Sequence, residues 1–228
     1  MRIDIVSVIP EILKSPFSNS MIQRAINKKI LEIYIHDLRK YGLGKRNKVD
    51  DYPYGGESGM VIRIEPVYRC FQKLFSKRDY DEKIFMTPDG NIFSQKYAYE
   101  FSCKKNIIIL CGRYKGIDQR IRDHLISKEI SIGPYVLSGG ELAAAVVVEA
   151  VTRLLPGVLN NPDSMITDSF QIKSINSPPL YTRPILYKGL SVPKILVSGH
   201  HKKIKDWLYK KSILKKKIEL LNYNFNIL

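Results

Sequence analysis

The chain has 228 residues, 44% of them hydrophobic, which is enough to bury the core of a main domain and of a smaller second one. Lysine and arginine number 37 against 22 acids, a formal net charge of +15, and a field of this sign attracts polyanions. Nucleic acid is therefore the leading class of partner, although abundant lysine can also reflect genome base composition.

Cysteine usage and the apolar runs exclude several other classes. The cysteines Cys70, Cys103 and Cys111 are odd in number and lack CxxC spacing, so neither a disulfide framework nor a zinc site is indicated. The longest apolar run, 142–148, is far shorter than the roughly 20 residues that span a bilayer, and the N-terminus has no small-residue cleavage site. We expect a soluble cytoplasmic protein without membrane contact.

The chain opens with a β-α-β pattern. Residues 3–9 are largely β-branched and end at Pro10, which predicts a buried strand. The apolar positions from Met21 to Ile26 have helical spacing, and residues 31–38 alternate as in a strand.

Residues 39–60 follow without periodicity and are rich in glycine and basic residues, which predicts a long functional or mobile loop. Tyr41, Tyr52 and Tyr54 lie among the basic residues, so the loop could hold phosphates and stack bases. An ordinary solvated loop is the alternative interpretation.

Strand and helix patterns then alternate as far as Leu155, which predicts an α/β domain with a mostly parallel sheet over residues 1–158. The helix expected at 140–155 is apolar almost all round, which indicates burial between other elements. The other expected elements are a helix at 65–75, a strand at 83–90 that runs into a Pro-Asp-Gly turn, a helix at 94–101 and a strand at 107–110.

The C-terminal part has a different character. Prolines recur between Pro156 and Pro193, and we interpret 159–176 as an interdomain linker. Residues 194–198 are expected to form a short strand and 201–221 a basic helix, so 177–228 is predicted to be a small helical domain.

Three glycine-containing turns follow apolar strands: 87–90, 112–116 and 133–140. Ligands of open α/β sheets lie beyond the carboxyl ends of strands, so these turns together could enclose a nucleotide-like molecule, although each turn alone is more often structural. Neither GxGxxG nor GxxxxGK[ST] is present, so a dinucleotide fold or a phosphate loop has no support.

Two ionisable residues follow these turns. Arg153 stands where an arginine commonly complements the helix dipole, and Asp168 stands where an aspartate commonly caps a helix or forms a turn. Neither residue alone indicates catalysis.

Several longer motifs occur in a fixed order from Met1 to about Ser212. Together they resemble the TrmD family of bacterial tRNA guanine-N1 methyltransferases, which belongs to the SPOUT superfamily. The motifs are IxxxxPE, DDYPYGGESGM, CGRYKGID, SIGPYVLSGGEL, RLLPG, DSF, YTRP and VPKILVSGHHKKIKDW.

The resemblance implies a SPOUT-type α/β fold whose mostly parallel sheet carries a deep trefoil knot. It implies a homodimer with a shared active site, in which the knot of one subunit holds S-adenosylmethionine and the other subunit helps to hold the tRNA. The expected product is 1-methylguanosine immediately 3′ of the anticodon. The resemblance leaves magnesium open as a second cofactor, and no residue is assigned as a metal ligand.

The matching motifs also assign site residues. Asp168 corresponds to the general base, and Arg153 corresponds to the arginine that supports it and the guanine oxygen. The residues assigned to the cofactor are Pro88, Gly112, Tyr114, Ile132, Gly133, Pro134, Tyr135, Val136, Leu137, Gly139 and Gly140. The residues assigned to tRNA are Arg39, Arg46, Asp50, Gly55, Gly59 and Ser169.

This chain departs from the family pattern at two positions near the expected cofactor. Lys115 stands where the family usually has Glu, and Pro134 stands where it usually has Asp. We therefore expect weaker cofactor affinity than is typical of the family, and tighter binding in Lys115→Glu. The end of the chain after Ser212 lacks the arginine-rich close usual there, which predicts looser tRNA selection.

Two other interpretations stay open at this point. One is a noncatalytic RNA-binding protein with a degenerate SPOUT fold, against which the presence of both Arg153 and Asp168 argues. The other is an unrelated nucleotide-binding α/β enzyme, which would need the phosphate-loop motif that is missing.

Overall fold

The structure is a computed structural model, and it describes residues 1–159 and 177–225. The chain divides into two compact units, Met1–Asn160 and Asn161–Leu228. The first unit ends close to the predicted domain end at residue 158. The predicted linker 159–176 lies, apart from residue 159, outside the described residues.

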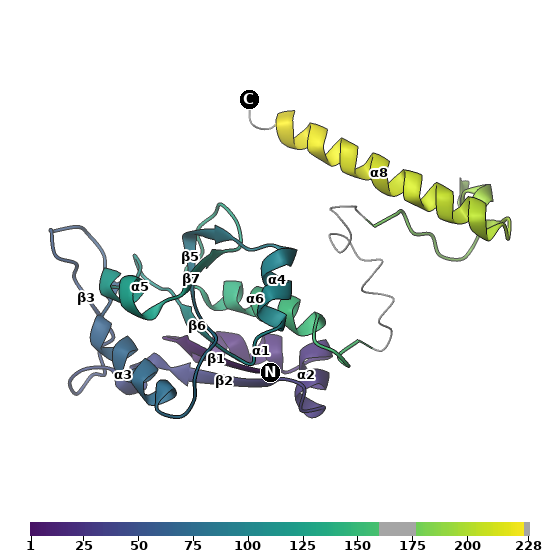
Figure 1. Cartoon of the computed structure of the whole chain (residues 1–228). Helices are drawn as coiled ribbons and strands as arrows, with labels where there is room; N and C mark the ends of the chain where they lie inside the picture. The colour runs from purple at the N-terminus through teal and green to yellow at the C-terminus, as the bar shows by residue number, and fades with distance from the viewer. Residues whose placement is uncertain (160–176, 226–228) are drawn as a thin grey trace. The chain divides into compact units, whose positions relative to one another are not determined.

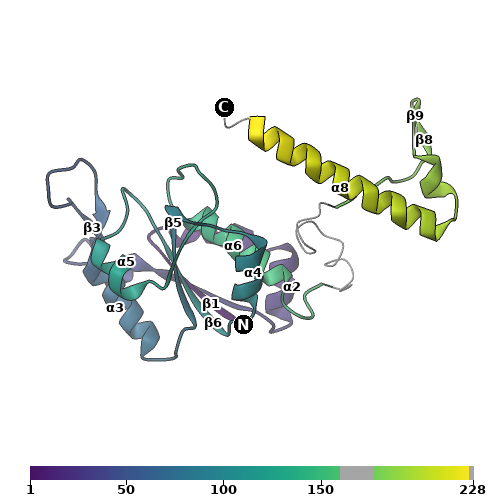
Figure 2. The ribbon, with the colours of Figure 1, turned by 45° about the horizontal axis from the view of Figure 1, so that its top comes forward.

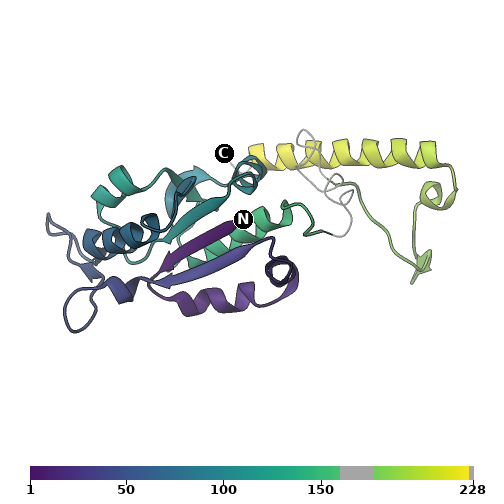
Figure 3. The same cartoon turned by 60° about the horizontal axis from the view of Figure 1, so that its bottom comes forward.

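A five-stranded sheet with the order β2-β1-β6-β5-β7 forms the centre of the first unit, and all of its neighbouring strands are parallel. The predicted α/β class is confirmed. Figure 3 shows β1 and β2 side by side in the same direction. The strands are β1 (Arg2–Ser7), β2 (Glu32–Asp37), β5 (Glu82–Ile92), β6 (Asn106–Cys111) and β7 (Lys128–Ser131).

Helices cover both faces of this sheet (Figures 1 and 2), as buried parallel strands require. One face carries η1 (Pro10–Leu13), α1 (Lys14–Phe17), α2 (Ser20–Asn27), α4 (Gln95–Ser102) and α6 (Glu141–Arg153). The other face carries η2 (Leu38–Tyr41), α3 (Ile64–Phe75) and α5 (Gln119–Leu125).

Strand β6 shows how the sequence divides between these two layers. Ile107, Ile109 and Cys111 pack on the α6 side, whereas Ile108 and Leu110 pack on the α3 side, as the two-residue period of a strand requires. All five side chains are buried, so the central strand is apolar from Ile107 to Cys111.

Two predictions about the first unit are wrong. The strand at 83–90 does not end at its Pro-Asp-Gly turn: β5 continues to Ile92, and the register breaks between Met86 and Asn91. The turn is therefore a bulge within the strand. Helix α6 is not buried all round, because Leu142 and Val146 are 54% and 48% exposed on the side away from the sheet.

The loop expected at 39–60 contains more local structure than its composition indicates. It includes most of η2 and an isolated bridge between Leu43 and Lys48. Strand β3 (Asp50–Asp51) pairs with β4 (Val61–Ile62) in an antiparallel ladder. The sequence pattern does not predict the bounds of α5 or β7, which lie outside this loop.

The described part of the second unit contains a hairpin and a long helix. Strands β8 (Leu186–Tyr187) and β9 (Leu190–Ser191) are joined by a two-residue turn, and α8 spans His201–Phe225, where a basic helix was predicted. The strand predicted at 194–198 is instead the 3₁₀ helix η3 (Lys194–Val197). Its backbone amides bond locally, from Leu196 to Pro193, rather than to a neighbouring strand.

A buried carboxylate lies in β1. Asp4 is fully buried and accepts hydrogen bonds from Arg2, from His36 Nε2 at 2.7 Å and from Tyr80 at 2.9 Å. Burial opposes its charge, but the hydrogen bonds from His36, Arg2 and Tyr80 outweigh burial and hold its pKa at about 2, below the ordinary value of 3.8.

We therefore expect the first unit to lose stability in acid. A carboxyl whose pKa is depressed on folding stabilises the protein above its unfolded pKa, and this contribution is lost as the pH falls from about 4 to about 2. The free energy of unfolding, measured by urea titration, should drop by on the order of 2 kcal/mol more over this interval in wild type than in Asp4→Asn. The exposed Glu11→Gln serves as a control that keeps the wild-type drop. An equal drop in Asp4→Asn would contradict the prediction.

Candidate active site

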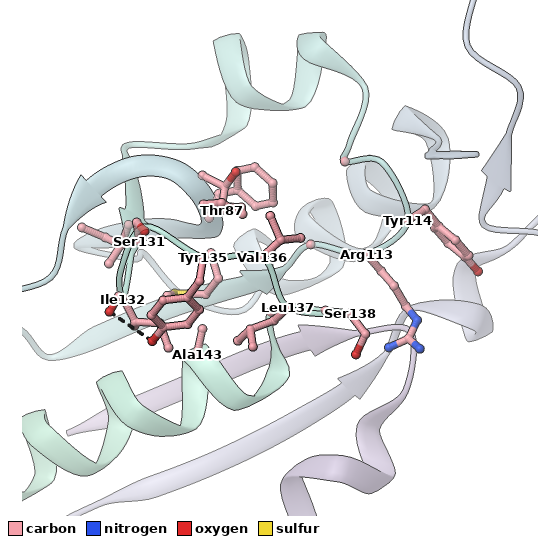
Figure 4. A pocket seen from close by; sticks show the side chains of 18 of the residues that line it. Thr87, Arg113, Tyr114, Ser131, Ile132, Tyr135, Val136, Leu137, Ser138 and Ala143 are labelled. Atoms are coloured by element: carbon pink, nitrogen blue, oxygen red, sulfur yellow. Dashed lines mark hydrogen bonds between the residues drawn. The ribbon is translucent and has the colours of Figure 1, made fainter. Parts of the chain in front are cut away.

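Three segments meet at the carboxyl edge of the sheet and enclose a cavity of about 390 Å³. They are the bulge within β5, the turn after β6 and the loop after β7, which are the three glycine turns singled out in the sequence. Figure 4 shows the third of these, which carries Tyr135, Val136 and Leu137, between Thr87 and the start of α6 at Ala143.

Glycines let two of these segments touch. The amide of Gly140 donates to the carbonyl oxygen of Gly112 at 2.8 Å, and Arg113 pairs with Gly139 in an antiparallel bridge. A Cβ atom on Gly140 would lie 2.9 Å from the Gly112 nitrogen and 3.0 Å from Met86 Cβ. Only a glycine fits at position 140 without moving backbone.

The backbone of the cavity wall takes conformations that side chains rarely allow. Tyr114 has φ +61°, and Gly116 and Gly133 have φ +142° and +156°. The ring of Tyr135 folds over Gly133, and its hydroxyl donates to the Ile132 carbonyl at 3.3 Å, the dashed line in Figure 4. Backbone groups and apolar side chains therefore form most of the wall.

Ten of the eleven residues that the motifs assigned to a cofactor line this cavity. The exception is Pro134, which is exposed and is not among the lining residues. The ten are Pro88, Gly112, Tyr114, Ile132, Gly133, Tyr135, Val136, Leu137, Gly139 and Gly140.

A buried polar group that the sequence analysis did not single out joins the first strand to the cavity. Glu141 is 2% exposed at the start of α6, and its Oε1 accepts from Ser7 Oγ at 2.7 Å. Its Oε2 lies 3.8 Å from Nη1 of Arg113, a buried atom that has no hydrogen-bond partner among the described residues. The sequence offered one signal for this pair: each of the glycine-containing motifs CGRY and GGEL carries a single charged residue, Arg113 in the first and Glu141 in the second.

The turn after β6 is also tied to the 39–60 loop. One backbone hydrogen bond joins them directly, from Lys115 N to Met60 O, and two more join the turn to β4, which follows the loop: Ile62 N to Gly116 O and Asp118 N to Ile62 O. In addition, Lys115 Nζ lies 3.2 Å from Glu57 Oε2. The wall of the cavity and the basic loop therefore form one connected structure.

The candidate tRNA residues within the loop are mostly open to solvent. Arg39, Arg46, Gly55 and Gly59 are exposed, whereas Asp50 is partly buried in β3. Two aromatic rings of the loop are also presented to solvent, with Tyr52 77% exposed and Tyr54 fully exposed, whereas Tyr41 is partly buried. The sixth candidate, Ser169, lies outside the described residues.

Of the two candidate catalytic residues, only Arg153 is among the described residues, and it does not line the cavity. Arg153 is half-buried at the last turn of α6, and the cavity lies at the first turn. A helix from 141 to 153 separates these ends by about 18 Å at 1.5 Å per residue. Asp168 lies outside the described residues.

Among the described residues, neither a metal-binding cluster nor a membrane-spanning helix occurs. No group of three or more His, Cys, Asp or Glu side chains there is placed to hold a metal ion. No helix there is long and apolar enough to cross a membrane. The three cysteines are free.

Comparison with known proteins places the chain in a family. The family model described as "tRNA (Guanine-1)-methyltransferase TrmD" matches residues 1–222. A tRNA (guanine-N(1)-)-methyltransferase of Azobacteroides pseudotrichonymphae is 55% identical over 213 residues, 93% of this chain and 96% of its own. The protein of the same name from Bacteroides fragilis is 54% identical over 213 residues, with 93% and 94% covered.

The crystal structure of the tRNA (m1G37) methyltransferase from Aquifex aeolicus is similar in fold as well. It has a TM-score of 0.79 and 36% sequence identity, with 95% of this chain and 92% of that chain covered. Both the full-length match and the high identities confirm the resemblance inferred from the motifs. The chain therefore belongs to the TrmD family of tRNA (guanine-N1)-methyltransferases.

Proposed function

We propose that this enzyme transfers a methyl group from S-adenosylmethionine to N1 of the guanosine immediately 3′ of the anticodon in tRNA. One observation carries the proposal: in a chain of this family, ten residues from three separate segments of the sequence line a single cavity. We further propose that the protein acts in the cytoplasm, and that the three segments around this cavity belong to a trefoil knot.

The cavity suits a nucleoside-like cofactor. Its volume is within the range of small-molecule sites, and its lining combines apolar side chains with the backbone groups of glycine turns. Those backbone amides and carbonyls would recognise the adenine edge, and the apolar side chains of Ile132, Val136 and Leu137 would cover the ring. S-adenosylmethionine, when bound, supplies an electrophilic methyl group.

The chain's own chemistry concerns the proton on guanine N1. A protonated ring nitrogen is a poor nucleophile, so a base must remove the proton while charge that develops on O6 is stabilised by a cation. Asp168 takes the proton in this proposal, and Arg153 holds O6 and orients Asp168. An aspartate with an ordinary pKa of about 3.9 is a weak base, so its efficiency depends on burial or tight positioning in the complex.

The position of Arg153 supports a site shared between two subunits. Within one subunit, α6 holds Arg153 about one helix length from the cavity, so the cavity of one subunit needs the Arg153 of another. The exposed Leu142 and Val146 on α6 provide apolar surface for a partner helix. In a dimer with twofold symmetry, such a surface would pair with its own copy and form two equivalent sites.

The 39–60 loop is the proposed tRNA contact nearest to the cofactor. It presents basic side chains and exposed tyrosine rings, which suit the phosphates and unstacked bases of single-stranded RNA. The hydrogen bond from Lys115 N to the carbonyl oxygen of Met60 joins the loop to the turn that lines the cavity, which supports a contact there. The target guanosine must leave the anticodon loop to reach the methyl group.

Lys115 gives a specific prediction about cofactor affinity. A lysine ammonium on the cavity wall repels the positively charged methyl donor, but Lys115→Glu alone would also place two carboxylates about where the Lys115–Glu57 pair now lies. We expect Lys115→Glu to tighten S-adenosylmethionine binding about two- to fivefold in a Glu57→Gln background, and less in the wild-type background.

Isothermal titration of the four proteins (wild type, each single variant and the double variant) measures this effect. Glu57→Gln alone is the control, and it should shift the Kd by less than about twofold, because an exposed ion pair contributes little. A double variant that binds no more tightly than Glu57→Gln would refute the explanation.

Transfer of labelled methyl to a tRNA transcript tests the proposed function. The transcript carries guanosine at the last anticodon position and at its 3′ neighbour, and a matched transcript carries adenosine at that neighbour. Label at N1 of the neighbour in the first transcript and its absence in the second supports the proposal. Tight tRNA binding without methyl transfer, with and without added magnesium, would favour a noncatalytic RNA-binding protein.

A further inference from the structure

A second cavity, of about 430 Å³, opens at the amino-terminal edge of the sheet. It is lined by the first residues of β1, β2 and β6 and by Leu155 and Pro156, which follow α6. It therefore lies at the opposite end of α6 from the cofactor cavity. We call it the basic cavity, because Arg2, Lys29, Arg78, Lys104 and Lys105 line it, and Glu32 is the only acid among the described residues that line it.

Only part of this positive charge is neutralised. Arg2 binds Asp4 and lies 3.7 Å from Glu32, and Lys104 lies 3.5 Å from Glu82. In contrast, Lys29, Arg78 and Lys105 form no ion pair with any residue that the structure describes. Cations gathered without partners around one hollow repel each other, and a bound anion would relieve that repulsion.

The backbone at Lys29 adds an independent indication. Lys29 follows the end of α2 with φ +58°, a conformation that favours glycine or asparagine over lysine. Glycine adopts this conformation without strain, whereas lysine does not, and the residue that is present lines the basic cavity. The sequence thus places a cation here at a conformational cost.

The neighbouring residues indicate which anion is involved. Arg153 precedes Leu155 by two residues, a distance of at most about 7 Å along the chain. If Arg153 meets the target guanosine, as proposed above, a phosphate near that nucleotide lies within reach of the basic cavity. Lysine and arginine side chains are the usual contacts of nucleic acid phosphates.

We propose that the basic cavity binds a backbone phosphate of the tRNA beside the modified guanosine, with Lys29, Arg78 and Lys105 as its ligands. The proposal rests on the proposed role of Arg153. In the dimer, the cavity would serve the site to which its own Arg153 contributes. It would thus anchor the RNA on the subunit that supplies Arg153, while the partner subunit holds the cofactor.

The test compares two triple variants with the same net charge. Lys29→Gln, Arg78→Gln and Lys105→Gln together remove the unpaired cations of the basic cavity. Lys14→Gln, Lys73→Gln and Lys96→Gln together remove three cations that lie outside both cavities. For each full-length protein, steady-state methyl transfer gives kcat and the KM for tRNA, and filter binding at several salt concentrations gives the salt dependence of tRNA affinity.

We expect the first triple variant to raise the KM for tRNA about tenfold or more, to keep kcat within about twofold, and to lower the slope of log K against log salt by about 1. The second triple variant should keep the KM for tRNA and kcat within about twofold of wild type and should keep the wild-type salt slope. Replacement of the same three residues by Arg, Lys and Arg should restore the KM, which a loss of folding would not permit.

Two outcomes would overturn the proposal. One is an equal KM and an equal salt slope in the two triple variants. The other is saturable binding of inorganic phosphate that the first triple variant abolishes without any change in the KM for tRNA, which would assign the cavity to a free anion. In both cases wild-type methyl transfer to the guanosine would still stand, so failure of this inference is distinguishable from failure of the proposed function.

Discussion

Replacement of Asp168 by alanine is expected to lower kcat for methyl transfer by about 10²- to 10⁴-fold, the contribution typical of a positioned general base. The Kd for S-adenosylmethionine should change by less than about twofold, because the role proposed for Asp168 is to take the N1 proton of guanine and not to hold the methyl donor. Single-turnover transfer of labelled methyl to the tRNA transcript measures the first quantity, and isothermal titration measures the second.

A matched aspartate provides the control. Asp123 is exposed on α5 and accepts a hydrogen bond from Gln119, so Asp123→Ala should keep wild-type kcat. If Asp168→Ala keeps kcat within about threefold of wild type, Asp168 is not the base. Raising the pH should partly rescue Asp168→Ala, because guanine N1 then loses its proton to the solvent and no longer needs a general base.

Mixed dimers then test whether the site is shared. One subunit carries Gly140→Ala, which damages its cofactor cavity, and the other carries Asp168→Ala, and each has its own affinity tag so that the heterodimer can be purified. A shared site leaves one complete site of two in that heterodimer, so about half of wild-type activity is expected. A site built within one subunit would leave none, since each subunit then lacks one of its parts.

The sheet and its cofactor cavity could be predicted because the determinants are local. Strand β6 is apolar on both faces and is followed by a glycine turn, and the loops after β5 and β7 repeat the arrangement. Parallel strands bring such loops to one edge, so the sequence order of strands and glycines is enough to predict a site there. Assignment of individual residues depended instead on the family motifs.

What escaped prediction depends on contacts between distant segments. The Pro-Asp-Gly sequence in β5 has the composition of a turn, but pairing with β7 on its far side keeps the strand extended to Ile92. Glu141 has the position of a helix N-terminal acid, and only the fold shows that it is buried against Ser7 from the first strand. The basic cavity gathers residues from five separate places in the sequence, so no motif marks it.

Replacement of Gly140 by alanine should have the second large effect, and it should act on the cofactor rather than on the base. The new methyl group would lie 2.9 Å from the backbone nitrogen of Gly112 and 3.1 Å from Cys111 Cα, and neither atom can move without displacing β6 or its turn. We expect the two walls of the cavity to separate, the hydrogen bond from Gly140 to Gly112 to weaken, and S-adenosylmethionine affinity to fall by at least about tenfold, equivalent to about 1.4 kcal/mol.

The measurements separate this effect from unfolding and from loss of the base. Gly140→Ala should keep wild-type far-ultraviolet circular dichroism, because α6 begins after Gly140 and alanine favours the helix. Affinity for tRNA in the absence of cofactor should stay within about threefold of wild type. Saturating S-adenosylmethionine should restore part of the methyl-transfer rate in Gly140→Ala and none in Asp168→Ala, since only the former loses affinity for the methyl donor. An unchanged Kd in Gly140→Ala would show that the contact between the glycine turns does not form the cofactor wall, and the assignment of this cavity would then be wrong.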